Sequence, residues 1–340
     1  MGTINLHSPL TASNQPCEVA VVLPCYNAAN YLARALDSVL AQTHPNFHIY
    51  VVDDGSTDET PTILEHYLDC AFYLRQEHRG QAAARNLGIR MSRSTYIAFL
   101  DADDYWLPDK LERQIAVLER NPSVGLVSSD CATIKNGTLA GSYFANSKPP
   151  RTGNLFTRLT RECFVFTPTV VVRRQCLEEV GLFHESLVVS EDFDLWLRIA
   201  ARWEIAVVPG VLAVRETRPE GLSLSTRPEI YLENGIAALE NVKSSCNRLS
   251  PGQARALQKA IAERYYVYGS HLLVTGLPYE SRTKLAEALR RWPIHWRAWV
   301  KCGLSFLPVG VSRRLRESRL RFARTGDSKS EARTCGPPDA

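Results

Sequence analysis

The chain has 340 residues, of which 45% are hydrophobic and 22% are charged, and its formal net charge is +4. This length and composition are typical of one large folded domain, or of one domain with an appendage. Because the net charge is so small, the composition gives no reason to expect a nucleic-acid partner. The nine cysteines are scattered without a CxxC pair, which argues against a zinc site.

The stretch 1–17 is an expected N-terminal extension, and it has no apolar core flanked by basic residues. We therefore expect no signal peptide there. The odd number of cysteines fits a reducing compartment, so the sequence predicts a cytoplasmic location. No apolar run in the chain reaches the ~18–20 residues that span a bilayer.

Residues 18–130 alternate between strand-like and helix-like stretches. Ser56 and Glu59 have the spacing of a capping box, which predicts that one of the helices begins at Ser56. Strand, helix, strand, repeated along the chain, predicts an α/β fold with a mostly parallel, Rossmann-like sheet and helices on both faces. The expected strands are 18–24, 47–54, 71–76, 95–101 and 124–130, and the expected helices are 28–43, 56–68, 80–92 and 108–120.

Residues 131–226 are less regular than the first part of the chain. The sequence predicts a strand at 167–174, then a helix at 190–203 whose first residues are acidic, as suits the positive end of a helix dipole. Two edge strands are expected after this helix, at 204–210 and 211–216.

From about residue 228 the pattern becomes helical, so we expect a domain boundary near residue 226. A helical C-terminal region should follow at 227–325, and the polar, Gly- and Ser-containing stretch 326–340 is expected to be a disordered tail. The helices expected in that region are 228–246, 251–275, 279–291, 294–306 and 312–323.

Polar side chains follow three of the expected strands. The carboxyl ends of parallel strands meet at one edge of a sheet, and ligands bind there in folds of this kind. We therefore expect the three clusters to form one functional edge, although ordinary turn chemistry is an alternative for any single cluster. The clusters are Pro24, Tyr26 and Asn27, then Asp53, Asp54, Gly55 and Ser56, and then Asp101, Asp103 and Asp104.

Asp101, Asp103 and Asp104 are crowded at the end of an apolar strand. Carboxylates this close together repel one another unless a cation or a proton is present. Mg²⁺ and Mn²⁺ prefer oxygen ligands, commonly one or two carboxylates together with phosphate oxygens and water. The Asp-x-Asp spacing therefore predicts a metal–diphosphate site with Mg²⁺ or Mn²⁺ as the cofactor.

Arg79 and Arg85 lie around the start of the helix expected at 80–92. A helix N-terminus and an arginine both favour phosphate, so the two residues are candidates for nucleotide binding. A solvated helix face is the alternative for Arg85. The chain has no GxxxxGK[ST] loop, no GxGxxG and no G-x-S-x-G elbow, which argues against the usual P-loop, dehydrogenase and hydrolase sites.

Five stretches of residues 18–226 resemble, in their order, the inverting family 2 glycosyltransferases of bacterial cell-surface polysaccharide assembly. They are "VVLPCYNAANYLARALDSVLAQT", "VVDDGSTDET", "GQAAARNLGI", "FLDADDYWLPDKL" and "SEDFDLWLRIA". The resemblance implies a GT-A fold, with a nucleotide-sugar half at about 18–130 and an acceptor half at about 131–226. It also implies transfer of a sugar from a nucleotide-diphosphate sugar, usually a UDP-sugar, to an acceptor hydroxyl on a glycan or lipid-linked sugar.

The resemblance also implies roles for the residues that match these motifs. Asp54 would hydrogen-bond the nucleobase, with Asp53 beside it, and Asp101 would lie near the ribose. Asp103 would bind the metal, while Asp104 would either support the site or cap the turn that follows. The residues expected to line the nucleobase are Pro24, Tyr26 and Asn27, and those expected to approach the nucleotide are Arg79 and Arg85.

Asp192, in "SED", resembles the family's catalytic base. A carboxylate there would take the proton of the acceptor hydroxyl as it attacks the anomeric carbon. By spacing alone, Glu191 and Asp192 read equally as N-terminal helix charges. The sequence departs from the family at Arg218, where a histidine is common, and at His184, where an aspartate is common. Arg218 keeps a cation for the diphosphate but removes a metal-ligand histidine, and His184 is expected to be structural.

The basic, aromatic stretch 292–322 predicts either a helix on the anionic cytoplasmic face of the inner membrane or a helix packed on the catalytic domain. The chain lacks the QxxRW motif and the membrane helices of the processive synthases, which favours transfer of a single sugar. Two other classes of function are alternatives: a haloacid-dehalogenase-like phosphatase with an aspartate nucleophile, and a non-catalytic sugar-nucleotide-binding protein.

Overall fold

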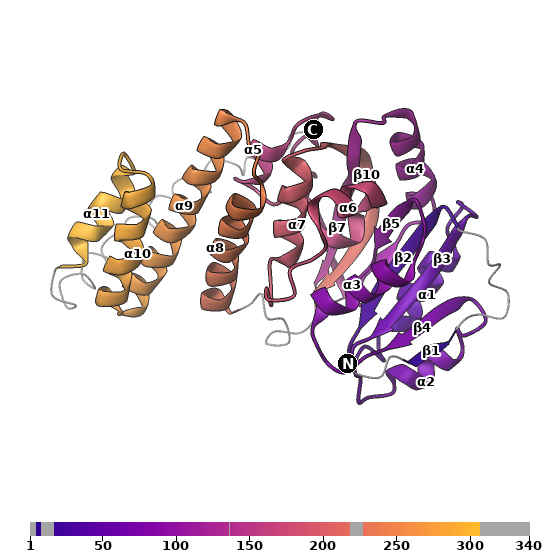
Figure 1. Cartoon of the computed structure of the whole chain (residues 1–340). Helices are drawn as coiled ribbons and strands as arrows, with labels where there is room; N and C mark the ends of the chain where they lie inside the picture. Colours follow the sequence, from indigo (N-terminus) through magenta and orange to yellow (C-terminus); the bar gives the residue numbers. More distant parts are fainter. Residues whose placement is uncertain (1–4, 8–16, 136, 218–226, 307–340) are drawn as a thin grey trace, which may run out of the picture. The chain divides into compact units, whose positions relative to one another are not determined.

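The protein is described by a computed structural model that covers residues 5–7, 17–135, 137–217 and 227–306 (Figure 1). The chain divides into two compact units, residues 1–260 and 261–340, and each unit is described by itself. Arg218, the expected helix 312–323 and the expected tail 326–340 lie outside the described residues.

The first unit is built on a ten-stranded mixed sheet in the order β1-β4-β3-β2-β5-β9-β7-β10-β6, with β8 paired to β7. Two parallel blocks, β4-β3-β2-β5 and β7-β10, are joined through the antiparallel strand β9. The strands are β1 (Asn5–His7), β2 (Val19–Cys25), β3 (Phe47–Asp53), β4 (Ala71–Arg75), β5 (Tyr96–Phe99), β6 (Tyr105–Trp106), β7 (Val124–Lys135), β8 (Thr138–Ser142), β9 (Val171–Arg173) and β10 (Glu204–Thr217).

Helices cover both faces of this sheet, as the alternating pattern predicts, because successive strand residues point to opposite sides. In β2, Val21 and Leu23 share a core with residues of α1 and α4. Val22 points the other way, and a Cβ built on Gly88 of α3 would lie 2.7 Å from its Cγ1. The helices of this unit are α1 (Leu32–Leu40), α2 (Thr60–Glu65), α3 (Gln81–Met91), α4 (Lys110–Arg120), α5 (Phe156–Leu159), α6 (Arg174–Val180), α7 (Glu191–Ala200) and α8 (Pro228–Ser245).

The predicted capping box is wrong, because Ser56 is engaged elsewhere. Its Oγ accepts a hydrogen bond from the Asn27 N–H at 3.0 Å, and its own N–H donates to Asp53 at 2.8 Å. The helix α2 therefore begins at Thr60, whose N–H donates to the Asp58 carboxylate at 3.0 Å.

The strand predicted at 167–174 is shorter than expected. It opens with a 3₁₀ turn at Thr167–Thr169, because Pro168 has no N–H to give a strand ladder, and β9 starts only at Val171. The two edge strands predicted at 204–210 and 211–216 are also wrong.

A single strand, β10, crosses the interval predicted as two edge strands and lies inside the sheet, between β7 and the short β6. A register shift at Val208 and Val211 lets the strand pass Pro209 and Gly210. Gly210 has φ +89°, which a bulge tolerates, so the proline and glycine bend the strand without ending it.

We expect a domain boundary near residue 226, whereas the two compact units of the structure divide at residue 260. The helix α8 belongs to the first unit because it packs against α7. Its Asn234 side chain accepts from the Val188 N–H at 3.1 Å, and Asn241 lies 3.0 Å from the ring nitrogen of His184. These contacts attach α8 to the segment that precedes α7.

The second unit is helical. Its elements include the end of α9 (Pro251–Thr275), then α10 (Pro278–Arg291) and α11 (Trp296–Leu304). A small core of Leu285, Ala288 and Ala298 joins α10 to α11. Among the described residues, no helix is both long enough and apolar enough to cross a membrane.

Candidate functional site

The loops after β2, β3 and β5 lie side by side at one edge of the sheet. Cys25, the last residue of β2, pairs with Asp53, the last residue of β3, and the Cys25 carbonyl accepts from the Asp54 N–H at 2.9 Å. On the other side of β2, the Leu100 N–H donates to the Val22 carbonyl at 3.2 Å. The three polar clusters therefore meet as the sequence predicts.

The first cluster is a short loop that is pinned by hydrogen bonds and exposes one aromatic ring. Pro24 is buried in β2, whereas Tyr26 is exposed and stacks on His78 with 4.1 Å between ring centroids. Asn27 has φ +46°, and its side-chain oxygen accepts from the Thr57 N–H at 2.9 Å. This arrangement leaves the stacked ring of Tyr26 available to a planar ligand.

Asp53 and Asp54 are buried, and each carboxylate holds a neighbouring segment in place. Asp53 accepts from Arg75 and from the Tyr73 hydroxyl, both at 3.1 Å. Asp54 accepts from the backbone N–H groups of Arg79 and Gly80, both at 2.8 Å. The two aspartates therefore fix the loops of the edge through contacts that the sequence motif does not reveal.

Arg79 and Arg85 occupy very different environments, although both were expected near the nucleotide. The Arg79 side chain is exposed and pairs with Glu185 at 2.8 Å. Arg85 is fully buried, and its guanidinium donates to Asp101 at 2.6 Å and to Glu191 at 2.7 Å. The solvated helix face considered for Arg85 is therefore wrong, and this residue joins the strand-end aspartates to the start of α7.

The crowding of Asp101, Asp103 and Asp104 is relieved in three ways. Asp101 is paired with Arg85. Asp103 is partly exposed, so water screens its charge. Asp104 is buried, and burial, followed by the charges of Asp103 and Asp101, raises the pKa of its carboxyl well above the ordinary value. One of its oxygens accepts from the Glu216 N–H at 3.1 Å, so it ties this turn to β10.

Two carboxyl groups open the helix α7. Burial, followed by the charge of Asp192, raises the pKa of Glu191 to about 7, while Arg85 opposes the rise. Asp192 is more exposed than Glu191 and accepts from the Thr167 hydroxyl at 3.1 Å and from the Phe193 N–H at 2.7 Å. The sequence analysis did not single out Thr167 as a partner of Asp192, because Thr167 lies in a segment without a motif.

Within the described residues, no group of three or more His, Cys, Asp and Glu side chains is arranged to hold a metal ion. The oxygen donors that are present nevertheless suit a hard divalent cation. Asp101 and Asp103 are partly exposed at the strand end, whereas Asp104 is buried with a raised pKa. One or two carboxylates with diphosphate and water completing the shell is the usual environment of Mg²⁺.

Residues 20–181 match the model of the family described as "Glycosyl transferase family 2". An uncharacterized glycosyltransferase of Rickettsia prowazekii is 34% identical over 202 residues, which cover 57% of this chain and 59% of the relative. The chain thus spans less than two thirds of that relative. The Escherichia coli protein WfgD, named a UDP-Glc:alpha-D-GlcNAc-diphosphoundecaprenol beta-1,3-glucosyltransferase, is 32% identical over 53% of this chain and 69% of its own length.

A similar solved structure is S. aureus TarS 1-349 in complex with UDP-GlcNAc. The TM-score is 0.69 at 18% sequence identity, and the match covers 88% of this chain and 92% of that one. At this identity the likeness shows the fold alone, and it confirms the predicted α/β architecture with a helical C-terminal region.

Proposed function

This chain belongs to glycosyltransferase family 2, and on that basis we propose that it moves a single sugar from a UDP-sugar to an acceptor hydroxyl with inversion of the anomeric centre. One observation carries the proposal. Buried Arg85 holds both Asp101, in the Asp-x-Asp turn, and Glu191, the neighbour of Asp192. The groups expected to hold the donor and to take the proton are therefore connected by a single side chain.

Asp192 is the proposed general base. A hydroxyl donor and a backbone N–H fix its two oxygens, so the carboxylate has a defined orientation at the N-terminus of α7. It would remove the proton of the acceptor hydroxyl, and inversion follows if that hydroxyl attacks opposite the leaving diphosphate. Buried Arg85 holds the neighbouring Glu191 carboxyl group and the carboxylate of Asp101 in place.

The donor is proposed to lie along the edge from Tyr26 to Asp103. The exposed ring of Tyr26 would face the nucleobase, and the loops fixed by Asp53 and Asp54 would shape its pocket. Asp103 would hold Mg²⁺ or Mn²⁺, and the ion would neutralise charge on the leaving diphosphate.

The acceptor is proposed to be a lipid-linked sugar or a growing glycan in cell-surface polysaccharide or glycolipid assembly. The name of WfgD specifies a lipid diphosphate sugar acceptor, and the proposal carries that class of acceptor to this chain. We further propose a cytoplasmic protein that works at the inner face of the membrane.

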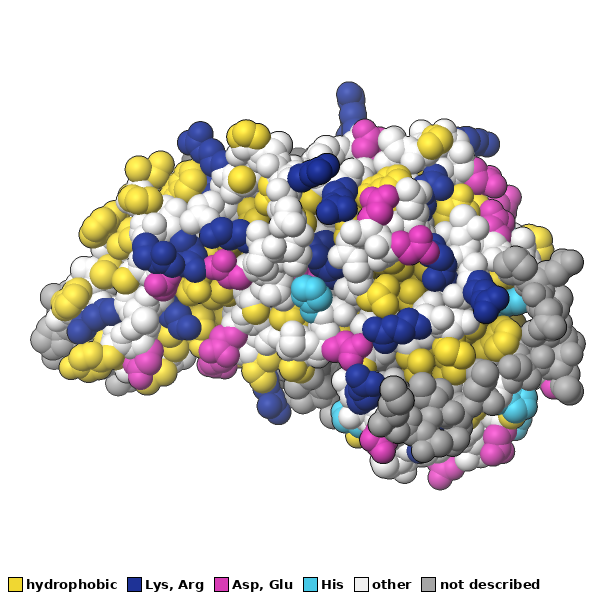
Figure 2. Space-filling model, viewed as in Figure 1, with side chains coloured by type: hydrophobic (Ala, Val, Ile, Leu, Met, Phe, Trp, Pro, Cys, Tyr) yellow, Lys and Arg dark blue, Asp and Glu magenta, His cyan; other side chains and the backbone are white. Residues whose placement is uncertain are grey.

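A surface of the second unit fits anionic lipid headgroups. Figure 2 shows hydrophobic side chains together with Lys and Arg over α10 and α11. Ile294, just before α11, is 75% exposed, and Trp296 and Trp299, in α11, are 68% and 59% exposed. Arg297 and Lys301 lie in the same helix. Exposed tryptophans beside basic residues are typical of proteins that rest on a membrane surface, and the positive charge complements anionic lipid.

The experiment that tests the proposed function combines donor binding with transfer. Thermal stability would be followed with UDP-, dTDP- and GDP-sugars, each with and without Mn²⁺, on the wild type, Asp103→Ala and Asp192→Asn. We expect a Mn²⁺-dependent shift with one nucleotide class that Asp103→Ala loses and Asp192→Asn keeps. Transfer should fall about 10²–10⁴-fold in Asp192→Asn, as for the loss of a general base.

Two results would contradict the proposal. Asp192→Asn with nearly full transfer would refute the base assignment. Release of phosphate from a phosphate ester without any sugar transfer would favour the phosphatase alternative, whereas donor binding without turnover by the wild type would favour a binding protein. Asp109→Asn, which changes a half-buried aspartate outside the site at the start of α4, is the matched control and should behave as the wild type.

A further inference from the structure

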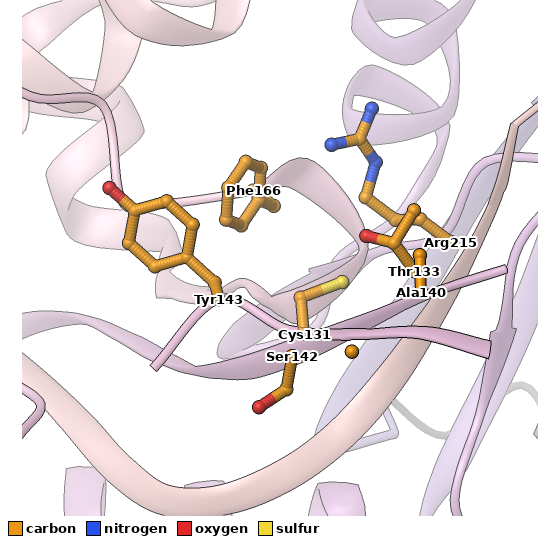
Figure 3. A pocket seen from close by; sticks show the side chains of 8 residues that line it. Cys131, Thr133, Ala140, Ser142, Tyr143, Phe166 and Arg215 are labelled. Atoms are coloured by element: carbon orange, nitrogen blue, oxygen red, sulfur yellow. The ribbon is translucent and has the colours of Figure 1, made fainter. Parts of the chain in front are cut away.

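A cavity of about 240 Å³ opens beside the hairpin of β7 and β8, in the first unit. Figure 3 shows its side chains. The ring of Tyr143 meets that of Phe166 edge to face at 5.0 Å between centroids, and the guanidinium of Arg215 lies 5.1 Å from the centroid of Phe166. Cys131, Thr133 and Ser142 contribute smaller side chains to the wall.

The cavity is linked on two sides to the groups proposed for catalysis. On one side, Arg215 precedes Glu216, whose N–H donates to the Asp104 carboxylate at 3.1 Å. On the other side, Phe166 precedes Thr167, whose hydroxyl donates to Asp192. Two lining residues, Arg215 and Phe166, are thus direct chain neighbours of residues that hold Asp104 and Asp192.

The side chains of the wall suit a sugar that carries a negative charge. The rings of Tyr143 and Phe166 offer apolar faces and edges for the C–H groups of a pyranose. Arg215 is exposed, and its guanidinium donates no hydrogen bond to any side chain or carbonyl in the described part of the chain. An arginine in this state can bind a phosphate through two parallel hydrogen bonds.

The volume limits what can fit. Pockets that enclose a drug-sized ligand are commonly about 300–1,000 Å³. A cavity of about 240 Å³ has room for one sugar ring.

We infer that this cavity is the acceptor subsite and that it takes a single sugar ring bearing a phosphate or diphosphate, with the ring against Tyr143 and Phe166 and the phosphate on Arg215. The inference rests on the proposed function, since it names the acceptor class for that reaction. A second role for Arg215, binding the diphosphate of the donor, would use the same chemistry, so the test has to separate acceptor from donor.

Binding is measured by titration calorimetry with N-acetylglucosamine 1-diphosphate carrying a pentyl ester, in the presence of saturating UDP so that the donor position is filled. The methyl glycoside of N-acetylglucosamine is the phosphate-free probe. The variants are Arg215→Gln and Phe166→Leu. Arg120→Gln is the matched control, because it removes an exposed arginine of α4 that does not line the cavity.

Arg215→Gln should weaken binding of the diphosphate probe about 10- to 100-fold, as for a lost hydrogen bond to a charged group, and leave the methyl glycoside unchanged. Phe166→Leu should weaken both probes, and Arg120→Gln neither. Equal affinities in the wild type and Arg215→Gln would overturn the inference. So would a loss in Arg215→Gln that appears only for UDP measured alone, since Arg215 would then serve the donor.

Transfer assays keep the two proposals apart. If the wild type transfers sugar to the diphosphate probe but the variants bind it normally, the cavity assignment fails and the proposed function stands. If the variants lose binding as expected but the wild type transfers no sugar from any donor, the proposed function fails and the cavity remains a phosphosugar site. An Arg215→Lys variant that recovers part of the diphosphate affinity would further support a charge-based contact.

Discussion

Arg85→Met removes a buried charge while nearly preserving the length of the side chain. Arg85 is fully buried, and its two carboxylate contacts measure 2.6 and 2.7 Å. Removal of one partner from a buried ion pair costs about 3–5 kcal/mol, because the remaining charge is left without compensation. With a urea m value of about 2 kcal/mol per M, the unfolding midpoint of the variant should fall by roughly 1.5–2.5 M at pH 8.

The effect should depend on pH in a defined direction. The pKa of Glu191 in the folded protein is raised to about 7, above the ordinary value of about 4.3, so ionisation of this carboxyl opposes folding. The protonated Glu191 carboxyl therefore contributes fully to the free energy of unfolding at low pH, and this contribution is lost as the pH rises through about 7. Because Arg85 lowers the pKa of Glu191, Arg85→Met should raise it further. At pH 8 the variant must then bury an uncompensated carboxylate, whereas at pH 5.5 Glu191 is protonated, so the destabilisation should be large at pH 8 and smaller at pH 5.5.

Urea titrations followed by tryptophan fluorescence at pH 5.5 and pH 8 measure both effects. The double variant Arg85→Met/Glu191→Gln should recover part of the stability at pH 8, because the buried partner is then neutral. Arg90→Met is the control, since Arg90 is an exposed arginine of the same helix, 3.7 Å from Glu185, and its loss should cost less than about 1 kcal/mol. A loss below about 1 kcal/mol for Arg85→Met, or one independent of pH and of Glu191, would refute this reasoning.

Three further changes test other parts of the structure. In EDTA, the free energy of unfolding of Asp104→Asn should rise relative to that of the wild type between pH 4 and pH 9, because the raised pKa of the Asp104 carboxyl makes its ionisation in the folded protein costly. Urea titrations in which the wild type gains instead would contradict this. Gly88→Ala should lower the free energy of unfolding by about 1–3 kcal/mol, since the new Cβ would lie 2.7 Å from the Val22 side chain. An unchanged urea midpoint would contradict this, because it would mean that α3 and the sheet can move apart without cost. The double variant Trp296→Ala/Trp299→Ala should lose co-sedimentation with vesicles containing anionic lipid but keep donor binding. Undiminished sedimentation would rule out this membrane surface.

Local patterns determined much of the fold and the place of the site. The alternation of apolar strands with amphipathic helices follows from the periods of the two structures, so the sequence predicts the sheet and its helical layers. The three polar clusters had to meet because parallel strands end at the same edge, and the pairing of Cys25 with Asp53 bears this out. The order of the five sequence motifs was enough to recognise the resemblance to family 2 glycosyltransferases, without any knowledge of contacts.

Only the tertiary structure decided which of these polar groups carry charge and which hold others in place. Arg85 and Glu191 are 106 residues apart in sequence, and they meet only because the folded chain brings the side chain of Arg85 in α3 to the first residue of α7. The same packing raises the pKa of Glu191, while burial against β10 raises that of Asp104. Desolvation and charge pairing depend on neighbours that are distant along the chain, so a motif names these residues but does not fix their protonation or their partners.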